Sequence, residues 1–389
     1  MRKTVFAGAL ILFFLFEGCQ LPTTVTPPKA ERQWTVMIYM AADNDLQAEA
    51  LEDLESMELV GSTEDVAVLV ELDTGAGTLR YLVVKDENPL VLASPVLENL
   101  GRVNSGSPEA LSTFIRFAWE RYPANHYALV LWNHGSGVKG TTKDISFDFT
   151  ARDSLTLPEL RFALTQGLSG RKLDLLGMDA CLMQMIEVAY EVKDCARVLV
   201  ASQENVPGAG WDYESLLSAL ARNPFLSPEA LSRVIVSSYI DFYRRSGIPG
   251  QYTGQYTLSA VDLLGISELA RYVDDLAEEI LSNSPSPWIY LTLRDSAVYF
   301  GDSDFIDLGD FVRLLSLDSR VPQRVQEKAL LVLGKLGECV LSSESLGIMG
   351  TTGLSIYFPY AVYERKYDAL QFASDTRWDD LIRYLMQWR

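Results

Sequence analysis

Two apolar runs that stop abruptly constrain the fold of this chain more than any other feature of its sequence. The first run, 129–132, ends just before His134, and the second, 173–178, ends just before Cys181. If both runs are strands of one parallel sheet, they place an imidazole and a thiol at neighbouring strand ends. Ligands and chemistry collect at the carboxyl ends of such strands, so the pair suggests a cysteine hydrolase.

The rest of the chain alternates apolar runs with amphipathic segments, which predicts an α/β fold with a mostly parallel sheet flanked by helices. Strands are predicted at 34–41, 66–72, 126–132, 172–177, 197–201 and 256–262, with a hairpin-like excursion at 80–84 and 90–93. A helix is predicted at 43–60, where Asn44 and Gln47 are spaced like a capping box. These elements define a predicted catalytic domain at 34–262, followed by a helix-rich α/β region at 263–389 that packs on it.

The first 18 residues have the features of a signal peptide. Arg2 and Lys3 precede an apolar run at 5–16 that is short for a membrane span. Cys19 follows a small residue at the end of this run, as in bacterial lipoproteins, which predicts lipid attachment; cleavage of an ordinary secretory signal is the alternative. Residues 19–33 are rich in Pro and Thr and are predicted to form a tether. We therefore expect a protein outside the cytoplasmic membrane, either anchored through Cys19 or secreted.

Charge and cysteine content exclude several classes of function. A net charge of −19 argues against nucleic acid as a partner. With two histidines and no CxxC pair, the chain lacks the usual pattern of a zinc site. Cys195 and Cys339 are expected either to pair or to remain as buried thiols. A monomer without a cofactor is expected.

A thiol and an imidazole together supply the chemistry of acyl transfer. The thiolate is the nucleophile, and a neighbouring histidine accepts its proton and later delivers it to the leaving amine. Gly135 lets a substrate approach the backbone closely, so the N–H groups of Gly135 and Cys181 are the predicted oxyanion hole. Taken singly, Cys181 is more simply a buried small residue and His134 a loop residue, but together they favour catalysis. An α/β-hydrolase esterase is disfavoured because the chain has no GxSxG elbow.

The sequence resembles the clostripain-type cysteine peptidases, which belong to the same broad clan as caspases, gingipains and legumains. Members of that clan end one strand in His-Gly and a later one in Ala-Cys, as this chain does at 134–135 and 180–181. Further segments that fit the family lie at 39–46, 132–137, 178–183, 187–190, 207–211 and 353–359. The resemblance implies a caspase-like sheet, a catalytic dyad of Cys181 and His134, and endopeptidase activity on peptide or protein substrates.

Enzymes of this family characteristically cleave after Arg or Lys, which implies acidic groups in the S1 pocket that receives the P1 side chain. Asp179 precedes Cys181 by two residues, so in a strand both side chains point the same way. Asp179 is thus the first candidate for binding a P1 cation; bracing the loop is the alternative. The loop 202–211 is expected to line the other side of the pocket, with Val206 and Ala209.

Ala209 departs from the family pattern, because basic-specific members carry an acid between the two glycines of that loop. Asp212, with Glu204 as the alternative, is the predicted replacement for that acid. Asp212 completes the set of predicted substrate-binding residues.

An aspartate cluster, a polar segment and an alternative function also follow from the sequence. Asp302, Asp304, Asp307 and Asp310 lack EF-hand spacing, and Asp307 is expected to cap a helix; the resemblance nevertheless allows a calcium ion. The segment 138–152 is expected to be a solvated loop or, as in some family members, a site of processing. A catalytically silent surface lipoprotein that binds peptide or glycan on the same scaffold is the alternative function.

Overall fold

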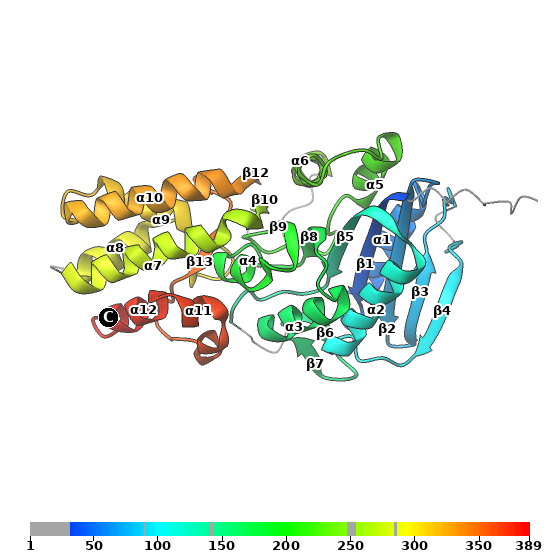
Figure 1. Ribbon diagram of the computed structural model, residues 1–389, viewed down its shortest axis with the longest axis horizontal. Helices are drawn as coiled ribbons and strands as arrows, with labels where there is room; N and C mark the ends of the chain where they lie inside the picture. Colours follow the sequence, from blue (N-terminus) through cyan, green and yellow to red (C-terminus); the bar gives the residue numbers. More distant parts are fainter. Residues whose placement is uncertain (1–31, 89–90, 140–143, 247–253, 284–285) are drawn as a thin grey trace, which may run out of the picture. The chain divides into compact units, whose positions relative to one another are not determined.

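A nine-stranded sheet forms the centre of the computed structural model (Figure 1). The structure describes residues 32–88, 91–139, 144–246, 254–283 and 286–389. The predicted signal peptide, Cys19 and nearly all of the predicted tether lie outside the described residues. Residues 31–389 form one compact unit, and the predicted division at residue 262 stays a prediction.

Five parallel strands occupy the middle of the sheet and confirm the predicted fold class. In spatial order they are β9 (Ala196–Ala201), β8 (Leu173–Asp179), β5 (Ala124–Trp132), β1 (Arg32–Ala41) and β2 (Val66–Thr74). Antiparallel strands extend both edges: β10 (Tyr256–Asp262) and β12 (Val340–Leu346) beyond β9, and β3 (Gly77–Leu82) and β4 (Val96–Gly101) beyond β2. The last eight residues of β1 are buried, as expected for a strand covered on both faces.

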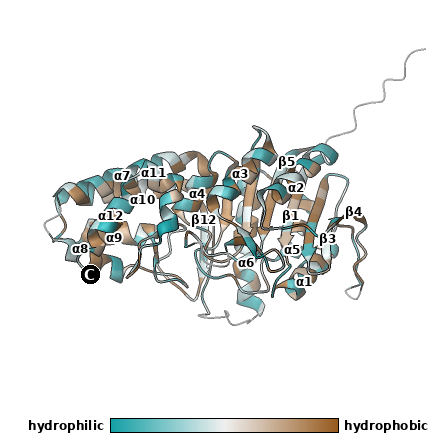
Figure 2. Cartoon of the chain, turned by 90° about the horizontal axis from the view of Figure 1, so that it is seen from below, coloured by the Kyte–Doolittle hydropathy of each residue, from teal (hydrophilic) through white to brown (hydrophobic). Residues whose placement is uncertain are grey.

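Helices cover both faces of the sheet, and alternate residues of each strand enter two separate cores. In β1, Met37 and Tyr39 belong to one core, whereas Val36 and Ile38 belong to the other. The second core is closed by α1 (Gln47–Glu58), α5 (Tyr213–Arg222) and α6 (Pro228–Ser246). The first is closed by α2 (Pro108–Arg121), α3 (Leu157–Leu168), α4 (Ile186–Val192) and α7 (Ile266–Asn283). Figure 2 shows the hydrophobic residues concentrated in the strands between these helices.

The C-terminal part is helix-rich, as predicted, and shares the first core with the sheet. Its helices are α8 (Pro287–Ser296), α9 (Leu308–Leu317), α10 (Gln323–Cys339), α11 (Gln371–Asp375) and α12 (Trp378–Met386), with short 3₁₀ turns at Leu263–Gly265 and Arg365–Ala369. Two small antiparallel pairs complete the fold, β6 (Ile145–Asp148) with β7 (Asp153–Leu155) and β11 (Phe305–Asp307) with β13 (Ser355–Tyr357). None of the helices in the described part of the chain has the length and apolar character that spanning a bilayer requires.

Three details differ from the sequence-based expectations. Helix α1 starts at Gln47 rather than near residue 43, and no side chain caps it. Asn44 lies ahead of the helix, where its Oδ1 accepts the Leu46 N–H and its Nδ2 donates to the carbonyls of Ala41 and Phe147. The outer strand of the edge hairpin lies at 96–101 rather than 90–93. Strand β12, which the sequence did not indicate, joins the central sheet beside β10.

Candidate active site

The two predicted catalytic residues follow neighbouring parallel strands at the same edge of the sheet. Strands β5 and β8 pair in a register that places Trp132 opposite Asp179. His134 and Cys181 each lie two residues beyond this pair. Both residues line one cavity of about 570 Å³, whose wall also includes the start of α1 and the loop 205–210.

Cys181 is a free, partly exposed thiol in this cavity. The N–H of Val206 donates to its Sγ at 3.3 Å, and the S–H lies 3.6 Å from the Val206 carbonyl oxygen. Burial is the main cause that raises the pKa of the Cys181 thiol to about 11; the hydrogen bond from Val206 opposes this rise, and the carboxylates of Asp179 and Glu204 add to it. The thiol therefore needs a base to become the thiolate that attacks.

The backbone around Cys181 is tightly turned. Leu182 is buried with a φ of +63°, a left-handed conformation that is unusual for a residue other than glycine. The His134 loop packs directly on this turn. The approach is so close that a Cβ added to Gly135 would lie 2.5 Å from the Cys181 carbonyl oxygen. Glycine at position 135 thus allows the two catalytic loops to meet.

His134 is held by a network that also contains a residue to which the sequence had assigned no role. Its Nε2 lies 2.8 Å from Oδ1 of Asp45, just ahead of α1. The Asn133 side chain accepts the His134 backbone N–H and donates to the carbonyls of Ala41 and Phe147. The position of Asp45 within the segment 39–46, which fits the family, was the one signal for it in the sequence.

Asp179 braces a loop and is also among the residues that line the cavity, so its role toward a P1 cation stays a prediction. Its Oδ2 accepts hydrogen bonds from the Trp211 N–H and the Tyr213 hydroxyl, each at 3.0 Å. Its Oδ1 is buried and has no hydrogen-bond partner among the described residues. Burial raises the pKa of Asp179 to about 7. Burial and the charge of Asp179 likewise raise the pKa of Asp53, which accepts a bond from Trp132 Nε1 at 2.7 Å.

The other predicted substrate-binding residues differ in whether they line the cavity. Val206 lines the cavity, but neither Ala209 nor Asp212 is among the described residues that do so. Asp212 caps α5 by accepting the Ser215 N–H, and it lies 3.7 Å from the Arg245 guanidinium. The Asp212 carboxylate therefore stabilises α5 and the segment next to it.

Of two further acids in this region, the sequence analysis considered one as a ligand for a P1 cation and missed the other. Glu204, the alternative acid, is buried and accepts the N–H of Asn205 in its own loop. An acid that the sequence analysis missed, Glu49 of α1, does line the cavity. Glu49 and Asp53 are four residues apart in the sequence, which was a signal that these two side chains share one face of α1.

The aspartate cluster considered for calcium is engaged in contacts within the chain. Lys139 lies 2.8 Å from Asp302 and 2.6 Å from Asp304. Asp307 caps α9 by accepting the Asp310 N–H at 2.8 Å, as predicted. Within the described ranges, no three His, Cys, Asp or Glu side chains are grouped as a metal site requires. The expected solvated loop at 138–152 is wrong for part of this segment, because Ile145–Asp148 forms β6 and is mostly buried; residues 140–143 lie outside the described residues.

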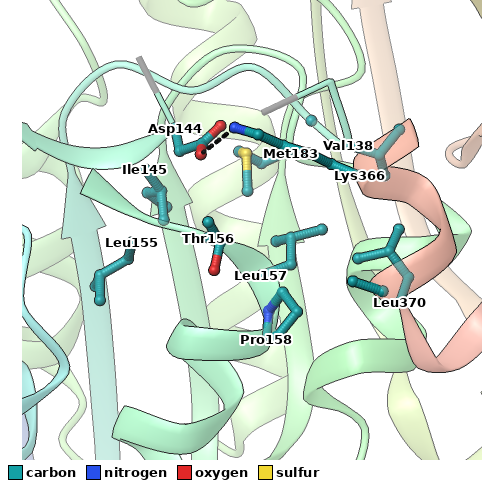
Figure 3. Close-up of a pocket in the computed structure, with 12 residues that line it drawn as sticks. Val138, Asp144, Ile145, Leu155, Thr156, Leu157, Pro158, Met183, Lys366 and Leu370 are labelled. Atoms are coloured by element: carbon teal, nitrogen blue, oxygen red, sulfur yellow. Dashed lines mark ion pairs between the residues drawn. The ribbon is translucent and has the colours of Figure 1, made fainter. Parts of the chain in front are cut away.

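A second cavity of about 240 Å³ adjoins the catalytic loops, since Gly137 and Met183 line it (Figure 3). Leu155, Leu157 and Leu370 make its wall largely apolar. The described lining contains no cysteine or histidine, whereas the larger, polar cavity holds both Cys181 and His134.

A caspase-like sheet with a thiol and an imidazole at adjacent strand ends defines a cysteine peptidase. Comparison with known proteins places the chain more narrowly: it belongs to the clostripain family, whose model matches residues 38–388. It is 25% identical to clostripain from Hathewaya histolytica over 87% of this chain and 77% of that protein.

Solved structures of the same family share the fold. A secreted C11 cysteine protease from Bacteroides thetaiotaomicron, solved with an irreversible peptide inhibitor, is 23% identical with a TM-score of 0.70, covering 92% of this chain and all of that one. An inactive zymogen of a C11 protease from Parabacteroides distasonis is 21% identical with a TM-score of 0.70, covering 89% of this chain and 99% of that one. The chain is therefore a cysteine endopeptidase.

Proposed function

We propose that this chain is an extracytoplasmic endopeptidase that uses a dyad of Cys181 and His134 to cleave peptide bonds after basic residues. One observation carries the proposal. Cys181, His134 and Asp179 line the same cavity, and among the described residues the buried Oδ1 of Asp179 has no hydrogen-bond partner. Such a cavity offers a nucleophile, a base and a negatively charged site for a P1 side chain.

The contact between His134 and Asp45 favours the tautomer that this chemistry needs. A carboxylate at Nε2 favours the tautomer with the proton on Nε2, so Nδ1 is the nitrogen that accepts the thiol proton. The Cys181 thiolate then attacks the scissile carbonyl, and the imidazolium returns its proton to the leaving amine. Water attacks the resulting thioester, with His134 again as the base, and releases the carboxylic acid and the free thiol.

The oxyanion formed in each attack is stabilised by the N–H groups of Gly135 and Cys181. Within the described residues, neither N–H donates to another backbone carbonyl. Both belong to the closely packed turn beside the thiol, where a preorganised donor contributes about 3 kcal/mol to transition-state stabilisation. The mechanism uses only groups of this chain.

The location of the enzyme is proposed from its first residues and its relatives. A signal peptide at 1–18 and lipid attachment at Cys19 would place a tethered catalytic domain outside the cytoplasmic membrane. The Bacteroides relative described as secreted supports this location. Replacing Cys19 with Ser is expected to move the protease from the membrane fraction to the soluble fraction; unchanged fractionation would contradict lipid attachment.

The dyad is tested with Cys181→Ala and His134→Ala on fluorogenic peptides that differ only at P1. Both variants are expected to lose hydrolysis, and the wild-type enzyme is expected to prefer Arg and Lys at P1. Cys339→Ala, which removes a buried thiol outside the cavity, is the matched control and should retain activity. Hydrolysis by Cys181→Ala at the wild-type rate would refute the assignment.

A further inference from the structure

An acidic face of α1 borders the catalytic cavity. Asp45, Glu49 and Asp53 recur at intervals of four residues, which places them along one side of the helix and its N-terminal approach. The side chain of Asp45 is 56% exposed, Glu49 is partly exposed, and Asp53 is buried. Asp45 contacts His134 and Asp53 contacts Trp132. These contacts leave the role of Glu49 unexplained.

Glu49 has an oxygen that nothing in the described structure satisfies. Its Oε2 is buried and has no hydrogen-bond partner among the described residues. Its Oε1 lies 3.5 Å from the point that a Cβ on Gly208 would occupy, so the carboxylate packs against the cavity loop. A first-turn acid interacts favourably with the helix dipole, but that interaction does not require an unsatisfied oxygen in a cavity wall.

Asp179 supplies a second unsatisfied oxygen in the same cavity. The residue is only 4% exposed, and its Oδ1 is also without a partner in the described ranges. The loop residues that line the cavity, 205–208 and Gly210, carry no charge. Of the three carboxylate residues that line the cavity, Asp45 contacts His134, whereas Asp179 from β8 and Glu49 from α1 each have an oxygen without a partner among the described residues.

We propose that Glu49 is a specificity residue of the S1 pocket and, together with Asp179, binds the guanidinium of a P1 arginine. The proposal rests on the proposed function, in which this cavity receives the P1 side chain. A guanidinium presents five N–H donors in one plane and can serve two carboxylates at once. Its binding satisfies both oxygens and neutralises charge that is otherwise costly to bury.

The test compares Glu49→Gln with Glu52→Gln on two peptides that differ only at P1. One peptide carries arginine and the other citrulline, which has nearly the same shape without the charge. Glu52 is exposed on the same helix and is absent from the described cavity lining, so its substitution is a matched loss of one charge. Active sites are counted by labelling with an acyloxymethyl ketone that has a neutral P1 group.

Glu49→Gln is expected to lower kcat/KM for the arginine peptide by about 10- to 100-fold, since a hydrogen bond to a charged group is lost. The citrulline peptide should be cleaved at an unchanged rate, and Glu52→Gln should leave both rates unchanged. Glu49→Asp keeps the charge and should retain part of the arginine preference, which shows that the fold tolerates substitution at this position.

Two results would overturn the inference while leaving the proposed function intact. An unchanged ratio of arginine to citrulline cleavage in Glu49→Gln would assign the preference to Asp179 alone. An equal fall for both peptides would show that Glu49 supports the dyad rather than specificity. If the wild-type enzyme itself does not prefer arginine to citrulline, the proposed basic specificity fails first, and this inference fails with it.

Discussion

At the scale of single residues, the site depends on carboxylates whose surroundings give them different tasks. Asp45 is exposed and meets the imidazole, whereas Asp179 is buried and keeps one oxygen unsatisfied. A carboxylate beside an imidazole can stabilise a developing imidazolium. Burial raises the pKa of the Asp179 carboxyl to about 7, so the proposed P1 preference is expected to depend on pH.

Asp45→Ala is expected to lower kcat by about 10- to 100-fold with KM little changed, because a partner that orients a catalytic histidine contributes on that scale. The exposed position of Asp45 implies that the melting temperature stays unchanged. Steady-state kinetics with one P1 arginine peptide measures the effect, and Asp43→Asn, two residues earlier, is the control. A rise in KM alone would show that Asp45 binds substrate rather than positions His134.

The preference for a basic P1 side chain should depend on pH through Asp179. Burial raises the pKa of Asp179 to about 7, so below neutral pH the carboxyl is protonated and its attraction for a cation is lost. The ratio of kcat/KM for P1 arginine to that for P1 citrulline is expected to fall as pH decreases from 8 to 5. Titration of the dyad affects both peptides and cancels in the ratio. A ratio that does not change with pH, or one that changes equally in Asp179→Asn, would contradict this role.

At the scale of elements, the ends of the two strands that precede His134 and Cys181 were predictable, whereas the position of α1 at the cavity was not. The runs before His134 and Cys181 are strongly apolar, so their ends are marked locally. The segment just ahead of α1, which carries Asp45, is held by a bond from Asn44 to the carbonyl of Phe147, 103 residues away in the sequence. Such long-range hydrogen bonds leave no periodic signal in the sequence.

Gly135→Ala should disable the enzyme through the packing of one loop on another. The added Cβ would lie 2.5 Å from the Cys181 carbonyl oxygen and 3.1 Å from the Ala180 Cβ, so the His134 loop must move away. We expect loss of one oxyanion donor, a fall in kcat of about 100- to 1,000-fold, with a fold that still forms. Gly334→Ala in α10 is the control, because its Cβ meets nothing within 4 Å and should raise stability by about 0.5–1 kcal/mol. Wild-type kcat in Gly135→Ala would contradict the proposed oxyanion hole.

At the scale of the whole molecule, the chain after residue 262 contributes to the same sheet and core as the catalytic loops. Strand β12 pairs with β10, and α12 enters the core that also contains Met178 and Ala180 of the Cys181 segment. The sequence did not predict β12 because its residues, Val-Leu-Ser-Ser-Glu-Ser-Leu, are half-exposed and lack a clear alternation. An edge strand of this kind is defined by its partner rather than by its own pattern.

Trp378→Ala should therefore destabilise the catalytic centre from a distance. Trp378 is fully buried, and its Nε1 donates to the Tyr357 carbonyl at 2.7 Å, so its loss leaves a large cavity and an unpaired acceptor. We expect the free energy of unfolding to fall by about 3–5 kcal/mol. Because one core joins both parts of the chain, the melting transition and the loss of Cys181 labelling should shift together. A variant that melts in two steps and keeps its labelling through the first would instead indicate that the regions before and after residue 262 fold as separate domains.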